Sequence, residues 1–232
     1  MKIFLLFFFL FGTCEIYSQS IVGTDGLLYV PTADFMNDKE IWFGTSVINK
    51  KYLDYNNHQY NIIAPYITLA FLPFLEVSAR INRMLSYPHY DSHSWDRMPS
   101  FRIKLLKEQE NLPGIIFGMH DFLRSTDAPT NYFNATYLVA TKHYEFQSFI
   151  RVIGLHIGYS APIIKSNSYQ LNGLFCGVNI SPVDFMQLIT EYDTYKVNCG
   201  IKILLLKHLQ LTAALENFNA ISVNMNVKLN LP

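Results

Sequence analysis

Hydrophobic and polar residues alternate along most of the chain, which is the pattern that β-strands give. In residues 220–229, apolar side chains alternate with polar ones throughout. Side chains on a strand point to opposite faces with a period of two, so this segment has an apolar face and a polar face. Residues 74–84 alternate in the same way, with Glu76 and Arg80 on the polar face. Both a soluble sheet with one wet face and the wall of a membrane barrel with a polar lumen give this pattern.

Similar segments follow one another and predict about twelve strands, within a range of roughly 10 to 14. The expected strands are 40–48, 60–71, 74–84, 100–108, 114–123, 132–142, 145–160, 173–180, 185–195, 198–206, 208–216 and 220–229. Short corners such as 143–144 alternate with longer polar loops such as 85–98. Strands of about nine to eleven residues suit a tilted crossing of a bilayer, whereas soluble strands average about five or six. No helix is convincing, so we predict an all-β fold: an antiparallel up-and-down transmembrane β-barrel.

The first residues have the pattern of a secretory signal peptide. Lys2 precedes an apolar run over 3–11, and small polar residues follow it. We expect cleavage after Ser18, which leaves 19–232 as a single barrel domain with a short N-terminal extension over 19–38. Two alternatives stay open, a retained anchor helix and lipidation of Cys14. The two glycines and the proline within 21–33 predict a shaped loop with a short extended piece.

Composition fits an exported barrel and argues against a nucleic-acid partner. The chain has 232 residues, of which 50% are hydrophobic and only 16% are charged, and it contains 15 Tyr and 18 Phe. The formal net charge is zero, so no basic excess is present to hold phosphate backbones. After the N-terminal segment, no apolar run reaches the roughly 20 residues that a membrane-spanning helix needs. Cys176 and Cys199 lie in strand-like segments, and small apolar packing is a stronger interpretation for them than a disulfide.

Motifs that would indicate catalysis or a cofactor are few. The sequence contains no Gly-x-Ser-x-Gly motif, phosphate loop or dinucleotide fingerprint. One loop holds four side chains of metal-ligand type: His89, Asp91, His93 and Asp96. They lack a defined ligand spacing, so a solvated loop is the stronger interpretation. His120 and Asp121 are adjacent, and adjacent strand residues point to opposite faces, which argues against a catalytic dyad. We predict no catalytic residue, no metal and no cofactor.

Charged residues on the predicted polar faces are the candidate functional residues. The residues expected to line the lumen are Glu76, Arg80, Arg102, Lys104, Glu108, Glu191 and Asp193. The first four come from neighbouring strands, so they can face each other across one wall. Buried charges must be paired or wet. Two interpretations follow: a salt-bridged plug inside a closed barrel, or a polar passage that sugars traverse or bind.

Several motifs, in order and spacing, are similar to those of one known family. They begin with Gly-Leu-Leu-Tyr-Val-Pro-Thr-Ala at 26–33, continue with 71–77 and 101–108, and reach Glu191-Tyr192-Asp193. The positions that carry the motifs include Gly26, Pro31, Thr32, Pro73, Asp121 and Lys142. From about residue 23 to residue 193, the chain resembles the YjbH family of exopolysaccharide-biosynthesis outer-membrane proteins.

This resemblance implies a β-barrel in the outer membrane of a Gram-negative bacterium, encoded among genes for a secreted polysaccharide or capsule. It implies no established catalytic residue. We therefore expect a non-enzymatic barrel that assists exopolysaccharide secretion or assembly. Its expected partners are outer-membrane lipid, polysaccharide and other secretion proteins, with no nucleic acid. Family members with this role are longer, so a complete conduit and an accessory barrel both stay open.

Two other functions also stay open. One is an outer-membrane enzyme that modifies lipid or glycan, with rim residues such as His120 or Asp121 in catalysis. The other is a soluble secreted β-sandwich that binds glycans through loops bearing Tyr and Trp.

Overall fold

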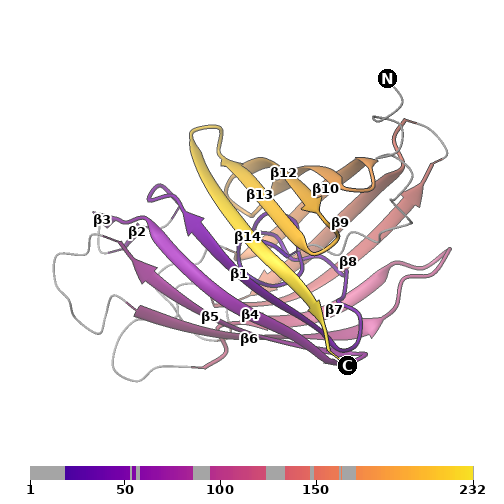
Figure 1. Ribbon diagram of the computed structural model, residues 1–232, viewed down its shortest axis with the longest axis horizontal. Helices are drawn as coiled ribbons and strands as arrows, with labels where there is room; N and C mark the ends of the chain where they lie inside the picture. The colour runs from indigo at the N-terminus through magenta and orange to yellow at the C-terminus, as the bar shows by residue number, and fades with distance from the viewer. Residues whose placement is uncertain are drawn as a thin grey trace.

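The computed structural model shows a closed antiparallel β-barrel (Figure 1). Residues 19–52, 54–55, 58–85, 95–123, 134–146, 149–161, 163 and 171–231 are described. The predicted signal peptide, Cys14 and the loop residues His89, Asp91 and His93 lie outside this set. Within the described part of the chain, no helix is long and apolar enough to span a bilayer.

Twelve strands form the barrel, and a separate small hairpin pairs β2 (Asp54–Tyr55) with β3 (His58–Gln59). The barrel strands are β1 (Glu40–Ile48), β4 (Ile62–Leu72), β5 (Leu75–Met84), β6 (Trp95–Leu106), β7 (Gly114–His120), β8 (Ala135–Glu145), β9 (Val152–Ala161), β10 (Gly173–Val183), β11 (Met186–Tyr192), β12 (Val197–Leu205), β13 (Leu209–Glu216) and β14 (Ala220–Asn230). Each strand pairs with its neighbours in the chain, and β1 closes the ring by pairing with both β4 and β14. The predicted all-β barrel of about twelve strands is confirmed. The alternative of a two-sheet sandwich is wrong.

Several predicted strand boundaries are also wrong, two of them by five residues or more. The loop expected over 85–98 ends earlier, because β6 begins at Trp95 and pairs with β5 from that residue onward. The corner expected at 143–144 lies inside the sheet, because these two residues pair with 153–154. Strand β8 instead continues to Glu145, and β9 begins at Val152.

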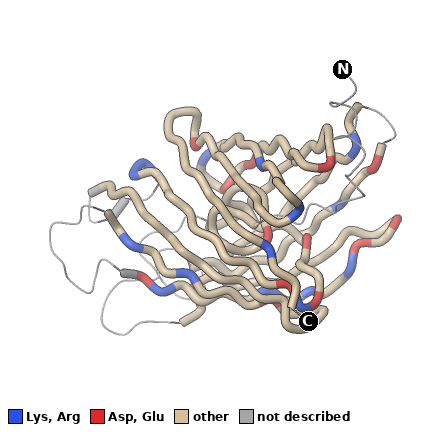
Figure 2. The backbone as a smooth tube through the Cα atoms, in the orientation of Figure 1, with Lys and Arg blue, Asp and Glu red and all other residues tan. Residues whose placement is uncertain are grey.

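The strands divide into an apolar outer face and a polar inner face. On β14, the odd-numbered residues from Ile221 to Leu229 are 37–64% exposed, whereas Ser222, Asn224 and Asn226 are buried. Strands β4, β7, β9 and β10 contain no Lys, Arg, Asp or Glu, and long uncharged stretches are visible along the barrel wall in Figure 2. The outer wall is therefore a band of exposed apolar side chains around a closed ring.

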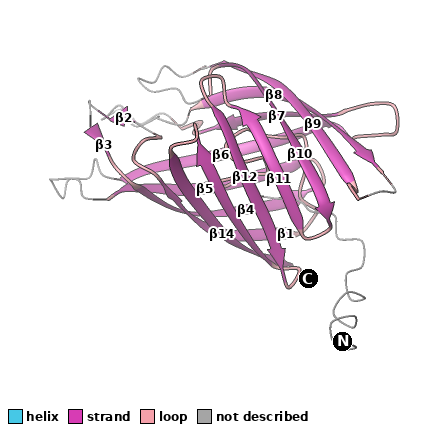
Figure 3. Ribbon diagram, turned by 90° about the horizontal axis from the view of Figure 1, so that it is seen from above, coloured by secondary structure: helices cyan, strands magenta, loops and turns pink. Residues whose placement is uncertain are grey.

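The two ends of the barrel differ in the length of their connections (Figure 3). At one end the strands are joined by 73–74, 107–113, 146–151, 184–185 and 206–208, and the barrel also begins and ends there at β1 and β14. We call this end the short-turn rim. The opposite end, the long-loop rim, carries the connections 49–61, 85–94, 121–134 and 162–172 and two short ones. Long and short connections segregated in this way are typical of outer-membrane barrels.

The N-terminal segment lies inside the barrel and does not pack outside it. Residues 19–32 are all buried, and Figure 1 shows this coil in the middle of the ring of strands. We call residues 19–36 the plug. The extension predicted over 19–38 as a shaped loop thus fills the lumen before the chain enters β1. This position makes the contact between plug and wall the candidate functional site.

Candidate functional site in the barrel lumen

The plug is folded mainly onto itself. Its backbone hydrogen bonds run from Ile21 N–H to the Leu28 carbonyl (2.8 Å) and from Leu27 N–H to the Val30 carbonyl (2.8 Å). Isolated bridges pair Gln19 with Asp25 and Gly26 with Pro31. A coil inside a barrel must satisfy its backbone groups, since a buried unpaired N–H or C=O is costly. The remaining groups of the plug bond to side chains of the wall.

Glu191 on β11 accepts a run of consecutive backbone N–H groups from the plug. Its carboxylate receives the N–H of Leu28 at 2.9 Å, of Tyr29 at 2.9 Å and of Val30 at 3.2 Å. Asn198 on β12 donates to the same carboxylate at 3.2 Å. Hydrogen bonds to an ionised acceptor are roughly twice as strong as neutral ones. The carboxylate therefore holds the plug at the middle of its motif.

Arg102 on β6 joins the wall to two parts of the plug. One guanidinium nitrogen donates to Glu76 on β5 at 2.5 Å and lies 3.7 Å from Asp25 of the plug. The other donates to the backbone carbonyls of Thr32 at 2.5 Å and Asp34 at 2.8 Å. The planar fork of Arg suits several fixed acceptors at once. Because Arg102, Glu76 and Asp25 are buried, loss of the cation would leave two buried carboxylates uncompensated.

Other wall side chains donate to carbonyl groups of the plug. Lys202 on β12 donates to the Gly26 carbonyl at 2.6 Å, and Arg80 on β5 donates to that of Val22 at 3.1 Å. Gln210, Ser46 and Thr68 bind the carbonyls of residues 19, 21 and 23. The wall supplies donors where the plug exposes carbonyls and an acceptor where it exposes N–H groups, so the two surfaces are complementary in hydrogen bonding.

Inward-facing glycines make room for the plug's apolar side chains. A Cβ on Gly177 would lie 2.2 Å from Leu27 Cδ1, and one on Gly200 would lie 2.6 Å from Leu28 Cδ2. Both leucines are buried, as are Ile21 and Val30. A larger residue at either glycine would overlap the plug. Protein interiors are close-packed, so even one added methyl group there lowers stability.

A polar cluster lies at the short-turn rim, outside the apolar band of the wall. Glu108 receives the His143 N–H at 2.7 Å, bonds the His143 ring at 2.8 Å and accepts from Lys142 at 3.0 Å. Partial burial alone would raise the pKa of Glu108, but these hydrogen bonds outweigh it and lower the pKa below its usual value. Asp34 of the plug lies 3.6 Å from the same ring. The cluster ties the connection between β6 and β7 to β8 and to the plug.

At the opposite side of the plug, Tyr29 anchors it near the long-loop rim. Its ring stacks on Tyr52 with centroids 4.0 Å apart, and its hydroxyl donates to the carboxylate of Glu216. Burial, followed by the neighbouring Glu216 carboxylate, raises the pKa of Tyr29 well above its usual value. The phenol is therefore a neutral donor at physiological pH. Asp193 caps the nearby turn by accepting the N–H groups of Tyr195 and Lys196.

The structure separates the charged residues that the sequence grouped as lumen-lining. Glu76, Arg80, Arg102 and Glu191 are buried against the plug. Lys104 is half-buried, donates to the Pro73 carbonyl at 2.9 Å and lies over the Phe35 ring. Glu108 belongs to the rim cluster and Asp193 to a turn. Of the motif positions, Gly26, Pro31 and Thr32 lie in the plug itself.

Sequence reasoning missed several wall residues, of which Lys202 is the clearest. It stands in the apolar run 201–206, which reads as apolar on both faces. The inward-facing positions on this strand are Asn198, Gly200, Lys202 and Leu204, so a period of two through Asn198 would have predicted that Lys202 faces the lumen.

His120 and Asp121 lie together at the end of β7. They are 3% and 0% exposed, and Asn134 donates to the backbone carbonyls of both. Asp121 has a φ of 52°, in the left-handed region, where Asp is tolerated better than most residues. Among the described residues, no group of three or more His, Cys, Asp and Glu side chains is arranged to hold a metal ion.

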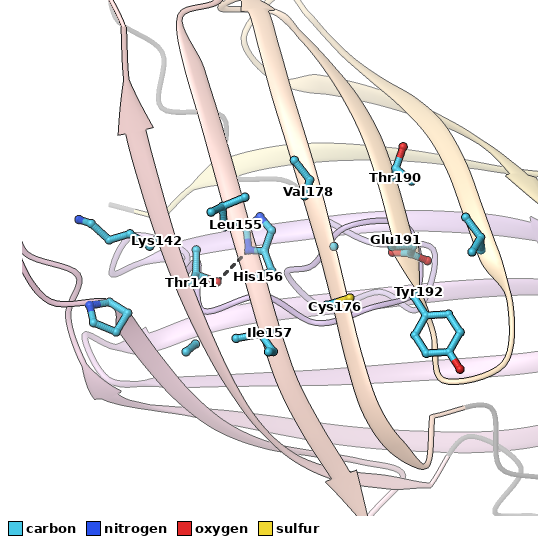
Figure 4. A pocket seen from close by; sticks show the side chains of 14 residues that line it. Thr141, Lys142, Leu155, His156, Ile157, Cys176, Val178, Thr190, Glu191 and Tyr192 are labelled. Carbon is cyan, nitrogen blue, oxygen red and sulfur yellow. Dashed lines mark hydrogen bonds between the residues drawn. The ribbon is translucent and has the colours of Figure 1, made fainter.

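A hollow of about 620 Å³ crosses the wall over β8 to β12 (Figure 4). Leu155, Ile157 and Cys176 line it and are exposed, so it opens on the outer face. His156 and Glu191 also border it, but their hydrogen bonds run to the interior, with His156 bonded to Thr141 at 2.8 Å. Its lining is almost entirely apolar. The hollow is part of the apolar outer band.

The architecture defines a class: an up-and-down β-barrel whose polar lumen is occupied by the chain's own N-terminal segment. The family model YjbH, described as exopolysaccharide biosynthesis protein YbjH, matches residues 18–232. The chain belongs to this family, which associates it with exopolysaccharide biosynthesis. No curated protein matches the chain.

Proposed function

We propose that the protein is a non-enzymatic outer-membrane β-barrel that assists the secretion or assembly of an exopolysaccharide. The observation that carries this proposal is the band of exposed apolar side chains around a closed twelve-stranded ring. In water such a band would be a large exposed apolar surface, which soluble monomers rarely have. In a bilayer it meets lipid, and a closed barrel leaves no unpaired strand edge there.

The distribution of charge along the strands supports the same proposal. Arg83, Arg97 and Lys142 occupy outward-facing positions, and each lies within three residues of the end of its strand. Charged side chains on a lipid-facing wall cost most at the bilayer centre and little near the interfaces. Between these ends, the outward-facing residues of the described strands carry no charge. The pattern therefore suits a wall that crosses a membrane.

A role without catalysis is supported by the state of the interior. The charged side chains of the lumen are bonded to the plug or to each other. His120 and Asp121, the residues considered for an enzyme, are buried beneath the long-loop rim. The proposed role for the polar lumen is to hold the plug, and through it to control whether the barrel is open.

Cell fractionation of the producing bacterium tests the proposal, together with deletion of the gene. We expect the protein in the outer-membrane fraction, with heat-dependent migration on a gel, and we expect the deletion strain to secrete less exopolysaccharide. Recovery of the mature protein in the soluble periplasmic fraction, or unchanged secretion in the deletion strain, would contradict it.

A further inference from the structure

We propose that the plug is displaceable and that the wall side chains which hold it become a binding track for a hydroxyl-rich, uncharged glycan when it withdraws. This inference rests on the proposed function and names the substrate class that the lumen would take. Three independent features of the lumen support it: how the plug is attached, how much room it occupies, and which groups it covers.

The plug is attached to the barrel without being part of its hydrogen-bonded ladder. The ring closes through β1, which pairs with β4 and β14 along its length. Among the described residues, no backbone-to-backbone hydrogen bond joins 19–36 to a strand. The wall contributes side chains to every hydrogen bond described above between the two. Withdrawal would therefore break no ladder bond, and the chain would stay tethered through 37–39 at the short-turn rim.

The room that the plug fills is consistent with a passage. A barrel of about eight strands is filled by its own side chains, whereas one of about 16 to 18 strands leaves an aqueous channel. This barrel has twelve strands and accommodates a folded segment in addition to its side chains. Inward glycines such as Gly177 and Gly200 widen the lumen where the plug's leucines lie. Withdrawal of the plug leaves that volume open.

The charged groups that hold the plug balance one another. Three cations and three carboxylates form hydrogen bonds with the plug: Arg80, Arg102 and Lys202, and Glu76, Glu191 and Glu216. The uncovered track would carry no net charge from this set. An anionic polymer would meet as many carboxylates as cations, so the balance favours an uncharged ligand.

The polar chemistry of the track matches that of a glycan. The plug presents both carbonyl acceptors and N–H donors to the wall, and wall side chains donate to the first and accept from the second. A sugar hydroxyl both donates and accepts, so it can replace either backbone group. Trp42, Tyr66 and Tyr137 are also buried on inward-facing positions and offer flat aromatic surfaces. Aromatic faces combined with bonded polar side chains bind the apolar faces and the hydroxyls of a sugar ring.

A disulfide between plug and wall tests the displacement. The variant Leu27→Cys/Gly177→Cys is made in a Cys176→Ala/Cys199→Ala background. These two positions are chosen because a Gly177 Cβ lies 2.2 Å from a Leu27 side-chain carbon, so the two thiols come within bonding reach. We expect the oxidised protein to secrete no more exopolysaccharide than cells lacking the gene. Reduction with dithiothreitol is expected to restore secretion.

Matched controls separate the effect of the disulfide between plug and wall from damage to the barrel. Each single-cysteine variant, which cannot form the disulfide, is expected to secrete equally with and without dithiothreitol, and heat-dependent gel migration shows that each barrel is folded. Secretion by the oxidised variant equal to that of its reduced form would overturn the displacement. If cells lacking the gene secrete normally, the proposed function itself fails. This result is distinct from equal secretion by the oxidised and reduced double-cysteine variant, which overturns the displacement alone.

The ligand class has its own readout in proteoliposomes. The rate at which a maleimide labels Leu27→Cys reports withdrawal of the plug, since this residue is buried when the plug is in place. We expect dextran, an uncharged glycan, to accelerate labelling and polygalacturonate, an anionic one, to leave it unchanged. Acceleration by polygalacturonate, or by neither glycan, would overturn the assignment of an uncharged ligand.

Discussion

Substitution of Glu191 by Gln is expected to loosen the plug without disturbing the wall. The amide can keep its oxygen toward Leu28 and Val30, but its NH₂ group then faces the Tyr29 N–H (2.9 Å) and the Asn198 amide (3.2 Å). The Tyr29 N–H keeps only a 3.2 Å contact to the other oxygen, the Asn198 amide keeps Asp193 at 2.9 Å, and the three plug N–H groups lose a charged acceptor. A hydrogen bond to a charged group is worth roughly 1.5–3 kcal/mol and a neutral one roughly 0.5–1.5 kcal/mol, so each of the three loses about 1 kcal/mol. A net loss of about 3 kcal/mol would raise the population of the undocked plug roughly a hundredfold.

Thiol labelling of the plug measures this population directly. The reporter is Leu27→Cys in the Cys176→Ala/Cys199→Ala background, reconstituted in lipid vesicles and treated with a maleimide. Glu191→Gln is expected to accelerate labelling roughly a hundredfold, whereas Thr190→Val, on the outer face of the same strand, should leave the rate unchanged. Equal rates in the Gln variant and the control would refute the conclusion that this carboxylate holds the plug.

Three further outcomes are expected. Arg102→Gln leaves buried carboxylates without their cation and should lower the free energy of unfolding in detergent by about 3–5 kcal/mol, as followed by tryptophan fluorescence. An unchanged unfolding midpoint would contradict the conclusion that Arg102 holds the plug to the wall. Gly200→Val sets a Cβ 2.6 Å from Leu28 and from a β13 carbonyl, so it should cost about 1–3 kcal/mol in the same assay, and a neutral result would mean that the plug does not pack there. The pKa of Glu108 is lowered, so its contribution to stability is complete above its unfolded pKa of about 4.3 and is lost as pH falls through the folded value. Glu108→Gln should therefore reduce the loss of unfolding free energy at acid pH in a pH series, and a pH profile identical to that of the unchanged protein would exclude this contribution of Glu108.

The barrel wall could be predicted from sequence because a single period governs it. Along β14 every second residue is apolar, and only one register places all of them outside. The turns were less predictable. Leu206 and Lys207 both take positive φ values of 51° and 63°, although the usual signal for such a turn is Asn-Gly or Asp-Gly. The pairing of the strands on both sides imposes this conformation.

The plug could not be predicted from the local pattern. Residues 19–36 have glycines, a proline and no sustained alternation, which indicates a loop and not its location. Their partners lie far away in sequence, as Tyr29 and Glu191 do, separated by 162 residues. The predicted polar face of β5 was informative, since Glu76 and Arg102 are opposite each other in register. The sequence did not indicate that the plug lies in the lumen and also contacts this pair.

Spin labelling along β14 in lipid vesicles tests most directly whether this is a plugged barrel in a membrane. A nitroxide is placed at each position from 221 to 227, and its accessibility to oxygen and to a water-soluble nickel chelate is measured. The odd-numbered positions should be accessible to oxygen alone, because they face lipid, and the even-numbered positions to neither reagent, because they are buried in the filled lumen. Nickel accessibility at the even-numbered positions would contradict the plug. Nickel accessibility at the odd-numbered positions would contradict the membrane-spanning barrel.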